Sequence, residues 1–409
     1  MGNQQHVAII GGGLAGAKSA EELRAKGFEG AISIFAAEDH LPYERPPFSK
    51  DYLQSKSEFA DALVHDGQWY QEHNISVHQN TRVASIDPAA KTLATEAGEI
   101  VGWDKLILAT GSAARRLPLP GTDASNVYYL RTVEDSTNIR SHFGKGKNLV
   151  IIGGGWIGLE VAAAARAAET NVTILEGAAA PLLNVLGPEN AAVFAKLHTD
   201  HGVNLRTGVK ITELAIQGSA ATGVVLAGGE VVPADAVVIG IGVAPEVQLA
   251  ESAGLDVENG VQVDAALRTS NPEIYAVGDI ANQAHPVLGH RVRVEHWATA
   301  LNQPAAVAAS ITGQPTEYTE LPYFFSDQYD LGMEYIGHAP NGSYDKIVVR
   351  GVADSLEFLA FWVSAEGRVL AGMNVNVWDV VDDVKSLILS SRSVDAAKLA
   401  DPSVPLGEL

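Results

Sequence analysis

Two glycine-rich segments of the same form, residues 11–16 and 153–158, constrain the fold of this chain more than any other feature. Each follows a short, largely apolar run, Val7 to Ile10 in the first copy and Asn148 to Ile152 in the second. Each is followed by residues with the apolar spacing of a helix. A strand that turns into a helix through the pattern G-x-G-x-x-G begins a nucleotide-binding βαβ unit. We therefore predict an α/β chain with two Rossmann-like units.

The three glycines of each copy have distinct tasks. The first permits a tight turn, the second lets the backbone approach a pyrophosphate, and the third lets the helix pack closely on the strand. In the first copy the helix is expected from Ala17 to Lys26, and Gly27 is its stop. The residues of the two turns predicted to contact nucleotide are Gly11, Gly13, Leu14, Ala15 and Gly16 in the first copy, and Gly153, Gly155, Trp156, Ile157 and Gly158 in the second.

An acid follows the second strand of each unit. Strand Ile32–Phe35 is followed by Glu38, and strand Val172–Leu175 runs directly into Glu176. A carboxylate at this place accepts hydrogen bonds from the ribose hydroxyls of an adenosine and repels a 2′-phosphate. No arginine lies between Glu176 and Arg206 to attract such a phosphate. The second unit is therefore predicted to prefer NADH over NADPH.

Composition excludes several classes of function. The 409 residues carry a formal net charge of −21, which disfavours nucleic acid and anionic membranes as partners. The chain has no cysteine, which excludes disulfides, thiolate metal sites, protein-held iron–sulfur clusters and thiol redox chemistry. Its apolar runs are too short to span a membrane. The N-terminal residues lack both the basic region of a signal peptide and a complete myristoylation signal, so a cytoplasmic location is expected.

Four further segments appear in a familiar order. They are Leu41–Lys50 with its prolines, Ile107–Ser112 with Ala-Thr-Gly, Thr269–Asp279 ending in Gly-Asp, and Tyr323–Gln328 with Phe-Ser-Asp-Gln. With the two glycine turns, this order resembles the FAD-dependent pyridine-nucleotide reductases, in particular the ferredoxin and rubredoxin reductases that serve oxygenases. The resemblance runs from about residue 6 to the end of the chain. It implies a glutathione-reductase-type fold with two nucleotide-binding domains and a C-terminal α+β domain.

The resemblance also implies roles for single residues. Lys50 is expected near the reactive edge of the flavin, and Glu160 near the nicotinamide, where it pairs with Lys50; these two form the catalytic set. The NAD set gains Glu160, Glu176, Gly240, Ile241 and Gly242. Beyond its glycine turn, the FAD set contains Ala37, Glu38, Arg45, Lys50, Val83, Ala109, Thr110, Gly111, Arg131, Gly278, Asp279, Glu295, His296, Trp297 and Phe325.

The chain departs from the family pattern at three places. Ala36-Ala37-Glu38 stands where many relatives have Gly-Asp-Glu, which leaves Glu38 as the ribose acid of the first unit. Phe325 replaces a common tryptophan before Ser-Asp-Gln, and Ala180 stands where many relatives have arginine. The details of electron transfer and of nicotinamide contact are therefore expected to differ.

The expected domains are an FAD-binding domain of residues 1–112 and 248–322, an NAD-binding domain of residues 113–247, and a C-terminal domain of residues 323–409. Residues 348–375 suggest a short antiparallel sheet, and Val380 to Leu389 a helix.

Because no thiol relay is available, electrons must leave directly from the flavin. The family resemblance implies a small [2Fe–2S] ferredoxin or a rubredoxin as acceptor, and indirectly an oxygenase. Nucleic acid and membranes are not expected as partners, and the chain is expected to be a monomer or a weak homodimer. A local basic patch would have to overcome the negative net charge. Its candidates are Arg45, Arg115, Arg116, Arg291, Arg293, Lys385 and Arg392.

Two other functions stay open. One is a flavin NADH oxidase, or a quinone or monodehydroascorbate-type reductase, that needs no protein partner. The other is a redox sensor like apoptosis-inducing factor. The acidic composition argues against a DNA-binding version of that sensor.

Overall fold

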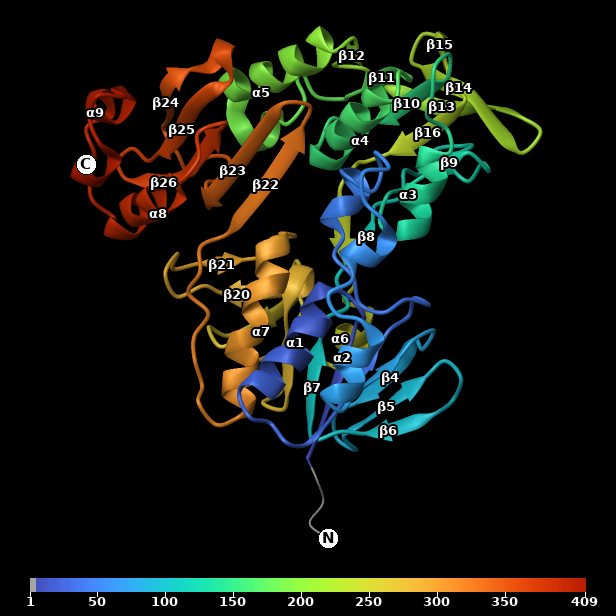
Figure 1. Cartoon of the computed structure of the whole chain (residues 1–409), viewed down its shortest axis with the longest axis vertical. Helices are drawn as coiled ribbons and strands as arrows, with labels where there is room; N and C mark the ends of the chain where they lie inside the picture. The colour runs from blue at the N-terminus through green and yellow to red at the C-terminus, as the bar shows by residue number, and fades with distance from the viewer. Residues whose placement is uncertain (1–4) are drawn as a thin grey trace. The chain divides into compact units, whose positions relative to one another are not determined.

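The computed structural model describes residues 5–409; residues 1–4, on which the expectations about a signal peptide and a myristoyl group partly rest, lie outside the described part. The chain forms two compact units (Figure 1). Within the described residues, the first unit comprises 5–44, 60–113 and 244–323, and the second comprises 45–59, 114–243 and 324–409. Among residues 5–409, no helix is long and apolar enough to cross a membrane.

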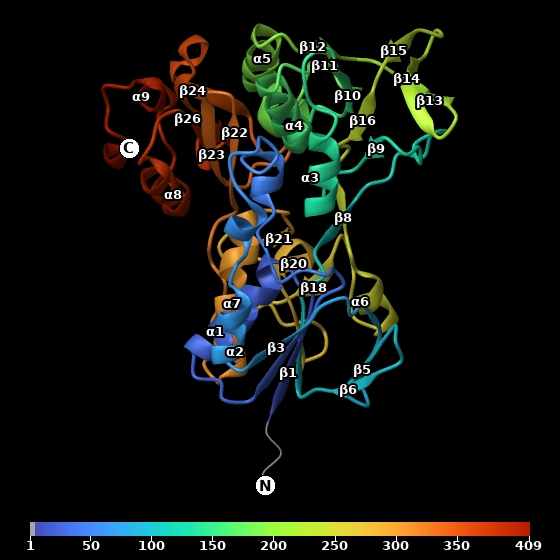
Figure 2. The same ribbon diagram turned by 45° about the vertical axis from the view of Figure 1, so that its right-hand side comes forward.

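The first unit is built on a five-stranded parallel sheet of order β19-β7-β1-β2-β3. Helices α1 and α7 pack against each other beside it, as both views show (Figures 1 and 2). The strands are short apolar runs, buried as parallel strands require. Their bounds are β1 His6–Ile10, β2 Ala31–Phe35, β3 Ile75–His78, β7 Lys105–Leu108 and β19 Ile274–Ala276, and those of the helices are α1 Leu14–Ala25 and α7 Trp297–Ile311.

The register of this sheet aligns the carboxyl ends of its strands. Ile10 lies opposite both Phe35 and Leu108, and Leu108 lies opposite Ala276. The loops that follow β1, β2, β7 and β19 therefore leave the sheet at one edge. In open α/β sheets this edge is where ligands bind.

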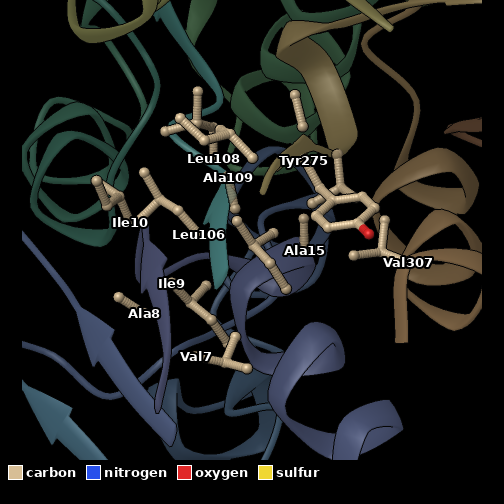
Figure 3. Packing of buried hydrophobic residues seen from close by; sticks show 14 of the residues in the cluster. Val7, Ala8, Ile9, Ile10, Ala15, Leu106, Leu108, Ala109, Tyr275 and Val307 are labelled. Carbon is tan, nitrogen blue, oxygen red and sulfur yellow. The ribbon is translucent and has the colours of Figure 1, made fainter. Parts of the chain in front are cut away.

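The core of the first unit joins segments that are distant in sequence. Side chains of β1, β7 and β19 meet Ala15 of α1 and Val307 of α7, and the ring of Tyr275 lies beside Val307 (Figure 3). Tyr275 is 1% exposed, and Val307 is fully buried. The strand from residues 274–276 is thus an integral part of the first nucleotide fold.

Smaller elements complete the first unit, and three of them, β8, β17 and η2, each have one residue in the second unit. Two three-stranded sheets have the orders β4-β5-β6 and β18-β20-β21. The remaining bounds are β4 Val83–Asp87, β5 Thr92–Thr95, β6 Ile100–Gly102, β8 Ser112–Ala114, β17 Val243–Pro245, β18 Val261–Val263, β20 Ala281–Ala284, β21 Arg291–Val292, α2 Gly67–Glu72, α6 Gln248–Ser252, and the 3₁₀ helices η2 Phe59–Ala62 and η3 Gly278–Ile280.

The second unit repeats the parallel sheet, with the order β12-β11-β10-β16-β9. Ile152 lies opposite both Leu175 and Ile239, and Leu175 is level with Arg206. The strands and helices of this part are η1 Pro46–Ser49, β9 Val127–Tyr128, α3 Val133–Arg140, β10 Asn148–Ile152, α4 Trp156–Ala167, β11 Asn171–Leu175, α5 Leu183–Asp200, β12 Asn204–Arg206, β13 Ile211–Gln217, β14 Ala220–Leu226, β15 Val231–Pro233 and β16 Ala236–Ile239.

The C-terminal residues of the second unit form a five-stranded antiparallel sheet of order β22-β23-β26-β25-β24, with α8 and α9 beside it (Figures 1 and 2). The buried guanidinium of Arg350 donates to the carbonyl oxygens of Asp401 and Val404, at 2.8 and 2.7 Å, and fastens the end of the chain. The bounds are β22 Tyr323–Gln328, β23 Leu331–Gly337, β24 Lys346–Val352, η4 Ala353–Ser355, β25 Glu357–Val363, β26 Val369–Val375, α8 Val381–Ser390, α9 Ala396–Ala400 and η5 Leu406–Glu408.

The predicted fold class, with two Rossmann-like sheets and a C-terminal α+β part, is confirmed. The predicted start of one helix was wrong: α1 begins at Leu14, three residues before the expected Ala17. Gly13 is extended and serves as the N-cap, so the helix includes Gly16. Strands β22 and β23 were not expected as part of the C-terminal sheet.

Candidate functional site

The first glycine turn approaches its neighbours too closely for any other residue. A Cβ atom added to Gly11, whose φ is +127°, would lie 2.0 Å from the carbonyl oxygen of Ala109. A Cβ on Gly16 would lie 2.0 Å from the carbonyl oxygen of Gly11, whereas no described atom lies within 4 Å of that position on Gly13. The outer glycines therefore close the turn, and Gly13 leaves room for a phosphate, as the nucleotide hypothesis requires.

The second turn has the same construction. A Cβ on Gly153 would lie 2.3 Å from the carbonyl oxygen of Gly240, and one on Gly158 would lie 2.3 Å from that of Gly153. Gly240 follows β16, so Gly240, Ile241 and Gly242 leave the sheet beside this turn. The predicted NAD residues of the glycine turn and of the β16 loop thus share one edge of the second unit.

The helices that start at the two turns leave their N-termini uncapped. Among residues 5–409, no side chain caps α1 or α4, and neither helix has an acid in its first turn. In contrast, Asp66 caps α2, and Thr132 and Asp135 form a capping box on α3. Free N–H groups and a positive helix end attract phosphate. Both sites therefore fit the pyrophosphate of a dinucleotide.

The acid of the first unit lies where the sequence predicts it. Glu38 follows β2 and accepts a hydrogen bond from the phenol of Tyr43. Ala37 beside it is exposed, so it leaves the carboxylate accessible from the sheet edge. Val83 behaves differently: its side chain is 7% exposed and belongs to the hydrophobic core.

The loops after β7 and β19 bring the other first-unit candidates to this edge. Ala109, Thr110 and Gly111 follow β7, and Thr110 donates from its hydroxyl to the carbonyl oxygen of Glu246 at 2.7 Å. Gly278 has a φ of +72°, and its N–H donates to the side chain of Gln303 at 2.8 Å. The 3₁₀ turn at Gly278 places Asp279 at the carboxyl end of β19, not at the start of a longer helix.

The segment before α7 holds three further candidates. His296 is the N-cap residue of α7, and the indole of Trp297 donates to Glu44 at 2.8 Å. Glu295 is exposed and pairs with Arg293 at 2.6 Å. Trp297 is therefore fixed by a polar partner rather than buried as a structural tryptophan.

Glu176 is the acid of the second unit, and the backbone holds both of its carboxylate oxygens. Its Oε2 accepts from the N–H of Gly154 at 2.5 Å, and its Oε1 accepts from the N–H of Ala178 at 2.7 Å. The carboxylate is thereby locked against the glycine turn. A ribose placed at the start of α4 would meet an oriented acceptor.

The first residues of α4 differ in their surroundings. Ile157 is 38% exposed. The ring of Trp156 packs edge-on against Phe194 and Phe324, with centroids 5.4 and 5.3 Å apart. Phe324 is therefore a packing residue, and only the backbone of Trp156 stays at the helix end.

Lys50 and Glu160 form the predicted ion pair. Lys50 Nζ lies 2.9 Å from Glu160 Oε2, and the two side chains are 14% and 5% exposed. The hydroxyl of Ser49 donates to the same oxygen at 2.5 Å, and the hydroxyl of Ser326 donates to Oε1 at 2.7 Å. The Nζ of Lys50 also lies 5.2 Å from the ring centroid of Phe325. Glu160 is thus a buried acceptor that three donors orient, not an exposed acid of a helix.

A hydrogen-bond chain continues from Ser326 into the core. Since the Glu160 carboxylate can only accept, Ser326 must accept in turn from the amide of Gln328, at 3.1 Å. The Gln328 oxygen then accepts from Nε2 of His198, at 2.9 Å, which leaves Nδ1 of His198 to accept from the hydroxyl of Tyr329, at 3.3 Å. Every link therefore donates toward Glu160.

His198 is fully buried, and its burial lowers the pKa of the imidazole to about 4. It is therefore neutral near pH 7, with its proton on the nitrogen that faces Gln328. This part of the site was missed by the sequence analysis, because His198 and Gln328 are 130 residues apart and only the fold brings them together. The signal for this hydrogen-bond chain in the sequence was the Ser-Asp-Gln segment, which contains Ser326 and Gln328.

A hydrogen bond links Arg45 to the backbone of Arg131 in the second unit. The guanidinium of Arg45 donates to the carbonyl oxygen of Arg131, just before the capping box of α3. Four other cations on the predicted docking patch have internal partners. Arg291 donates to backbone carbonyls of residues 263 and 282, Arg293 pairs with Glu295, Arg116 stacks on Tyr129, and Arg392 donates to the carbonyl oxygen of Leu409.

Comparison with known proteins supplies the family. The pyridine nucleotide-disulphide oxidoreductase model matches residues 5–303, and the reductase C-terminal model matches residues 323–409. The ferredoxin–NAD(+) reductase component of the anthranilate 1,2-dioxygenase system of Burkholderia cepacia is 39% identical, over 97% of both chains. Putidaredoxin reductase of Pseudomonas putida is 36% identical, over 100% of this chain and 97% of the relative.

Among solved structures, the covalent putidaredoxin reductase–putidaredoxin complex matches with a TM-score of 0.95 and 36% identity, over 99% of this chain and 97% of the other. The likeness spans both nucleotide sheets and the C-terminal sheet. The residues at the two sheet edges fit FAD and NADH, the cofactors of this group of enzymes. The chain is an oxidoreductase that belongs to the pyridine nucleotide-disulphide oxidoreductase family.

Proposed function

We propose that the protein is an NADH-dependent flavoprotein reductase that delivers single electrons to a small [2Fe–2S] ferredoxin or a rubredoxin, and through it to an oxygenase. The observation that carries the proposal is the pair of complete nucleotide turns, each with an uncapped helix and an acid after the next strand. One relative named above is the ferredoxin–NAD(+) reductase component of a dioxygenase system, and the other is a putidaredoxin reductase. The absence of cysteine in the sequence removes the thiol relay that related disulfide reductases need.

The two turns receive different cofactors in this proposal. Gly11, Gly13 and Gly16, with Glu38 and Asp279, hold FAD, and the turn at Gly153 with Glu176 holds NADH. Bound FAD supplies the chemistry, because it accepts two electrons as a hydride and can release them one at a time.

Lys50 and Glu160 orient the reacting groups. The ammonium of Lys50 lies 2.9 Å from Glu160 Oε2, and the Lys50 side chain is 14% exposed. A fixed cation stabilises the negative charge that hydride transfer brings to its acceptor. Glu160 itself is held by Ser49 and Ser326, so its own position is also set before a nucleotide binds.

The proposal includes the organisation of the chain and its location. An FAD-binding domain of residues 1–112 and 248–322, an NAD-binding domain of residues 113–247 and a C-terminal domain of residues 323–409 are the divisions we propose. The cytoplasm, where NADH is the common reductant, is the location that this function implies. The protein is proposed to work as a monomer or a weak homodimer.

Spectroscopy of the purified protein tests the proposal. The protein should be yellow, with one FAD per chain, and an anaerobic titration should bleach it with one equivalent of NADH and much more slowly with NADPH. Reduced protein should then reduce putidaredoxin or rubredoxin faster than oxygen or a quinone. A colourless protein that takes up no FAD would overturn the flavin assignment, and fast turnover with oxygen alone would favour the oxidase instead.

A further inference from the structure

An arginine stands beside the ribose acid of the second unit. Arg206 ends β12, level with Leu175 at the end of β11, and its carbonyl oxygen accepts from the N–H of Glu176 at 2.9 Å. The next residues return to the same loop, because the N–H of Gly208 donates to the carbonyl oxygen of Ala178 at 2.8 Å. Neighbouring strands are about 4.8 Å apart. An arginine side chain at this position is long enough to reach a group bound at Glu176.

The guanidinium of Arg206 is engaged elsewhere. Its two terminal nitrogens pair with the two carboxylate oxygens of Glu230, at 2.6 and 2.7 Å. Glu230 lies in the turn between β14 and β15, where its own carbonyl oxygen accepts from Leu226 at 2.8 Å. The pair occupies the flat, two-pronged face that arginine offers to carboxylates and phosphates. It also cancels the positive charge next to the ribose position.

We propose that Arg206 and Glu230 are specificity-determining residues, in which Glu230 withholds Arg206 from the 2′-phosphate of NADPH. The preference for NADH then has two causes. Glu176 repels the phosphate at the ribose, and Glu230 occupies the guanidinium of Arg206, whose backbone adjoins that acid. The inference rests on the proposed function, since it needs an adenosine ribose bound at Glu176.

The ion pair of Arg206 and Glu230 is partly exposed, so it is expected to be weak. The side chains of Arg206 and Glu230 are 28% and 58% exposed. Ion pairs in such surroundings add little stability. Removal of Glu230 should therefore leave the fold intact and change only what Arg206 can bind.

A pair of small ligands isolates the effect of the 2′-phosphate. 5′-AMP and 2′,5′-ADP differ only in that group, and their dissociation constants can be measured by titration calorimetry on the FAD-loaded protein at low ionic strength. The wild-type chain should bind 5′-AMP more tightly than 2′,5′-ADP. In Glu230→Gln the affinity for 2′,5′-ADP should rise on the order of fivefold, with that for 5′-AMP unchanged.

The double variant Glu230→Gln/Arg206→Ala should lose this gain. Asp200→Asn is the matched control, since it breaks another exposed ion pair of the same unit, between Asp200 and Lys196, at 2.5 Å. It should change neither dissociation constant.

An unchanged affinity of Glu230→Gln for 2′,5′-ADP, or a gain that survives the loss of Arg206, would overturn the inference while the nucleotide site stands. If the wild-type chain bound neither ligand, the proposed nucleotide site would fail, and the inference with it.

Discussion

The two nucleotide turns share one backbone design but hold their acids in different ways. In both turns, a Cβ atom added to either outer glycine would lie 2.3 Å or less from a backbone oxygen. In both, the helix that follows has no side-chain cap among the described residues. Glu38 lies two residues beyond Ala36 and is held by the phenol of Tyr43. Glu176 follows the last residue of β11 directly and is held by two backbone N–H groups. A side-chain partner can rotate away when a ligand arrives, whereas the backbone cannot.

The helices that follow the turns also differ at one matched position. Glu160 lies two residues after Gly158 in α4, and Lys18 lies two residues after Gly16 in α1. Glu160 is buried among three donors. Lys18 pairs with Glu21 at 2.5 Å, and these two side chains are 17% and 27% exposed. The same fingerprint is thus followed by a carboxylate with three donors in one unit, and by a partly exposed ion pair in the other.

The largest expected effect on cofactor binding comes from adding a side chain to the first glycine of either turn. Gly11→Ala and Gly153→Ala each combine a positive φ with a backbone clash, and each should destabilise its unit by about 2–5 kcal/mol. Gly11→Ala should yield protein without flavin, whereas Gly153→Ala should stay yellow and lose NADH binding. Flavin absorbance and NADH titration measure the two outcomes. Gly98→Ala, at a φ of +85° with no described atom within 4 Å, is the control for backbone strain alone.

Removing the buried carboxylate of Glu160 is expected to lower the stability more than removing the partly exposed ammonium of Lys18. Glu160→Gln leaves Lys50 without its charged partner and should lower the free energy of unfolding by about 3–5 kcal/mol. Lys18→Gln should change it by less than about 1 kcal/mol. Urea unfolding compares the two, and stopped-flow bleaching by NADH should be slowed only in the Glu160 variant. Equal effects of the two substitutions would show that burial does not distinguish the helices.

Lowering the pH should destabilise the second unit, because the buried imidazole of His198 resists protonation in the folded state. The unfolded His198 takes up a proton below its ordinary pKa of 6.5, but the folded one does so only near pH 4. The contribution of His198 to the free energy of unfolding is therefore fully present above pH 6.5, and about 3 kcal/mol of it is lost as the pH drops to 4. His198→Gln should flatten this slope in unfolding curves measured across that range.

A buried histidine of the first unit, His285, serves for comparison with His198. Burial also lowers the pKa of His285, which is 3% exposed and contacts the carbonyl oxygen of Glu320 at 3.0 Å. His285→Gln should remove a smaller part of the slope. A slope that persists unchanged without His198 would assign the acid sensitivity to the carboxylates instead.

The smallest expected effect is a change in the choice of reductant, which should follow from replacing Glu176 but not from replacing Glu38. Glu176→Gln removes the charge that repels a 2′-phosphate and should raise the ratio of NADPH to NADH efficiency about tenfold. Glu38→Gln should leave that ratio unchanged and weaken only the retention of FAD. Ratios of kcat/KM for the two reductants, with flavin content measured alongside, decide this. A shift in both variants would mean that the two turns do not divide the cofactors as proposed.

The sequence predicts the nucleotide edges well because their signals are local. The apolar runs before Gly11 and Gly153, the glycines themselves and the acid after the next strand lie within about thirty residues of one another in each unit. The strand at residues 148–152 has the predicted bounds. The pair of Lys50 and Glu160 was expected only from family resemblance, since 110 residues separate them.

The polar surroundings of that pair could not be predicted, because long-range packing decides them. Ser326, Gln328 and His198 come from β22 and α5, and neither segment has a local pattern that announces a hydrogen-bond chain. The same holds for the arginines chosen as docking candidates. Net charge and spacing cannot reveal that Arg291 already donates to two backbone carbonyls inside its own unit.

The late position of β19 in the chain has a consequence for synthesis on the ribosome. The sheet of the first unit needs residues 274–276, and its helix α7 ends only at Ile311. The parallel sheet of the second unit is already complete at Ile239. At a translation rate of about 5–20 residues per second, strand β7 waits on the order of ten seconds or more for its outer neighbour. The nucleotide fold that comes first in the sequence is thus the second to close, and the edge of β7 stays unpaired, and so prone to aggregation, until residues 274–276 have been made.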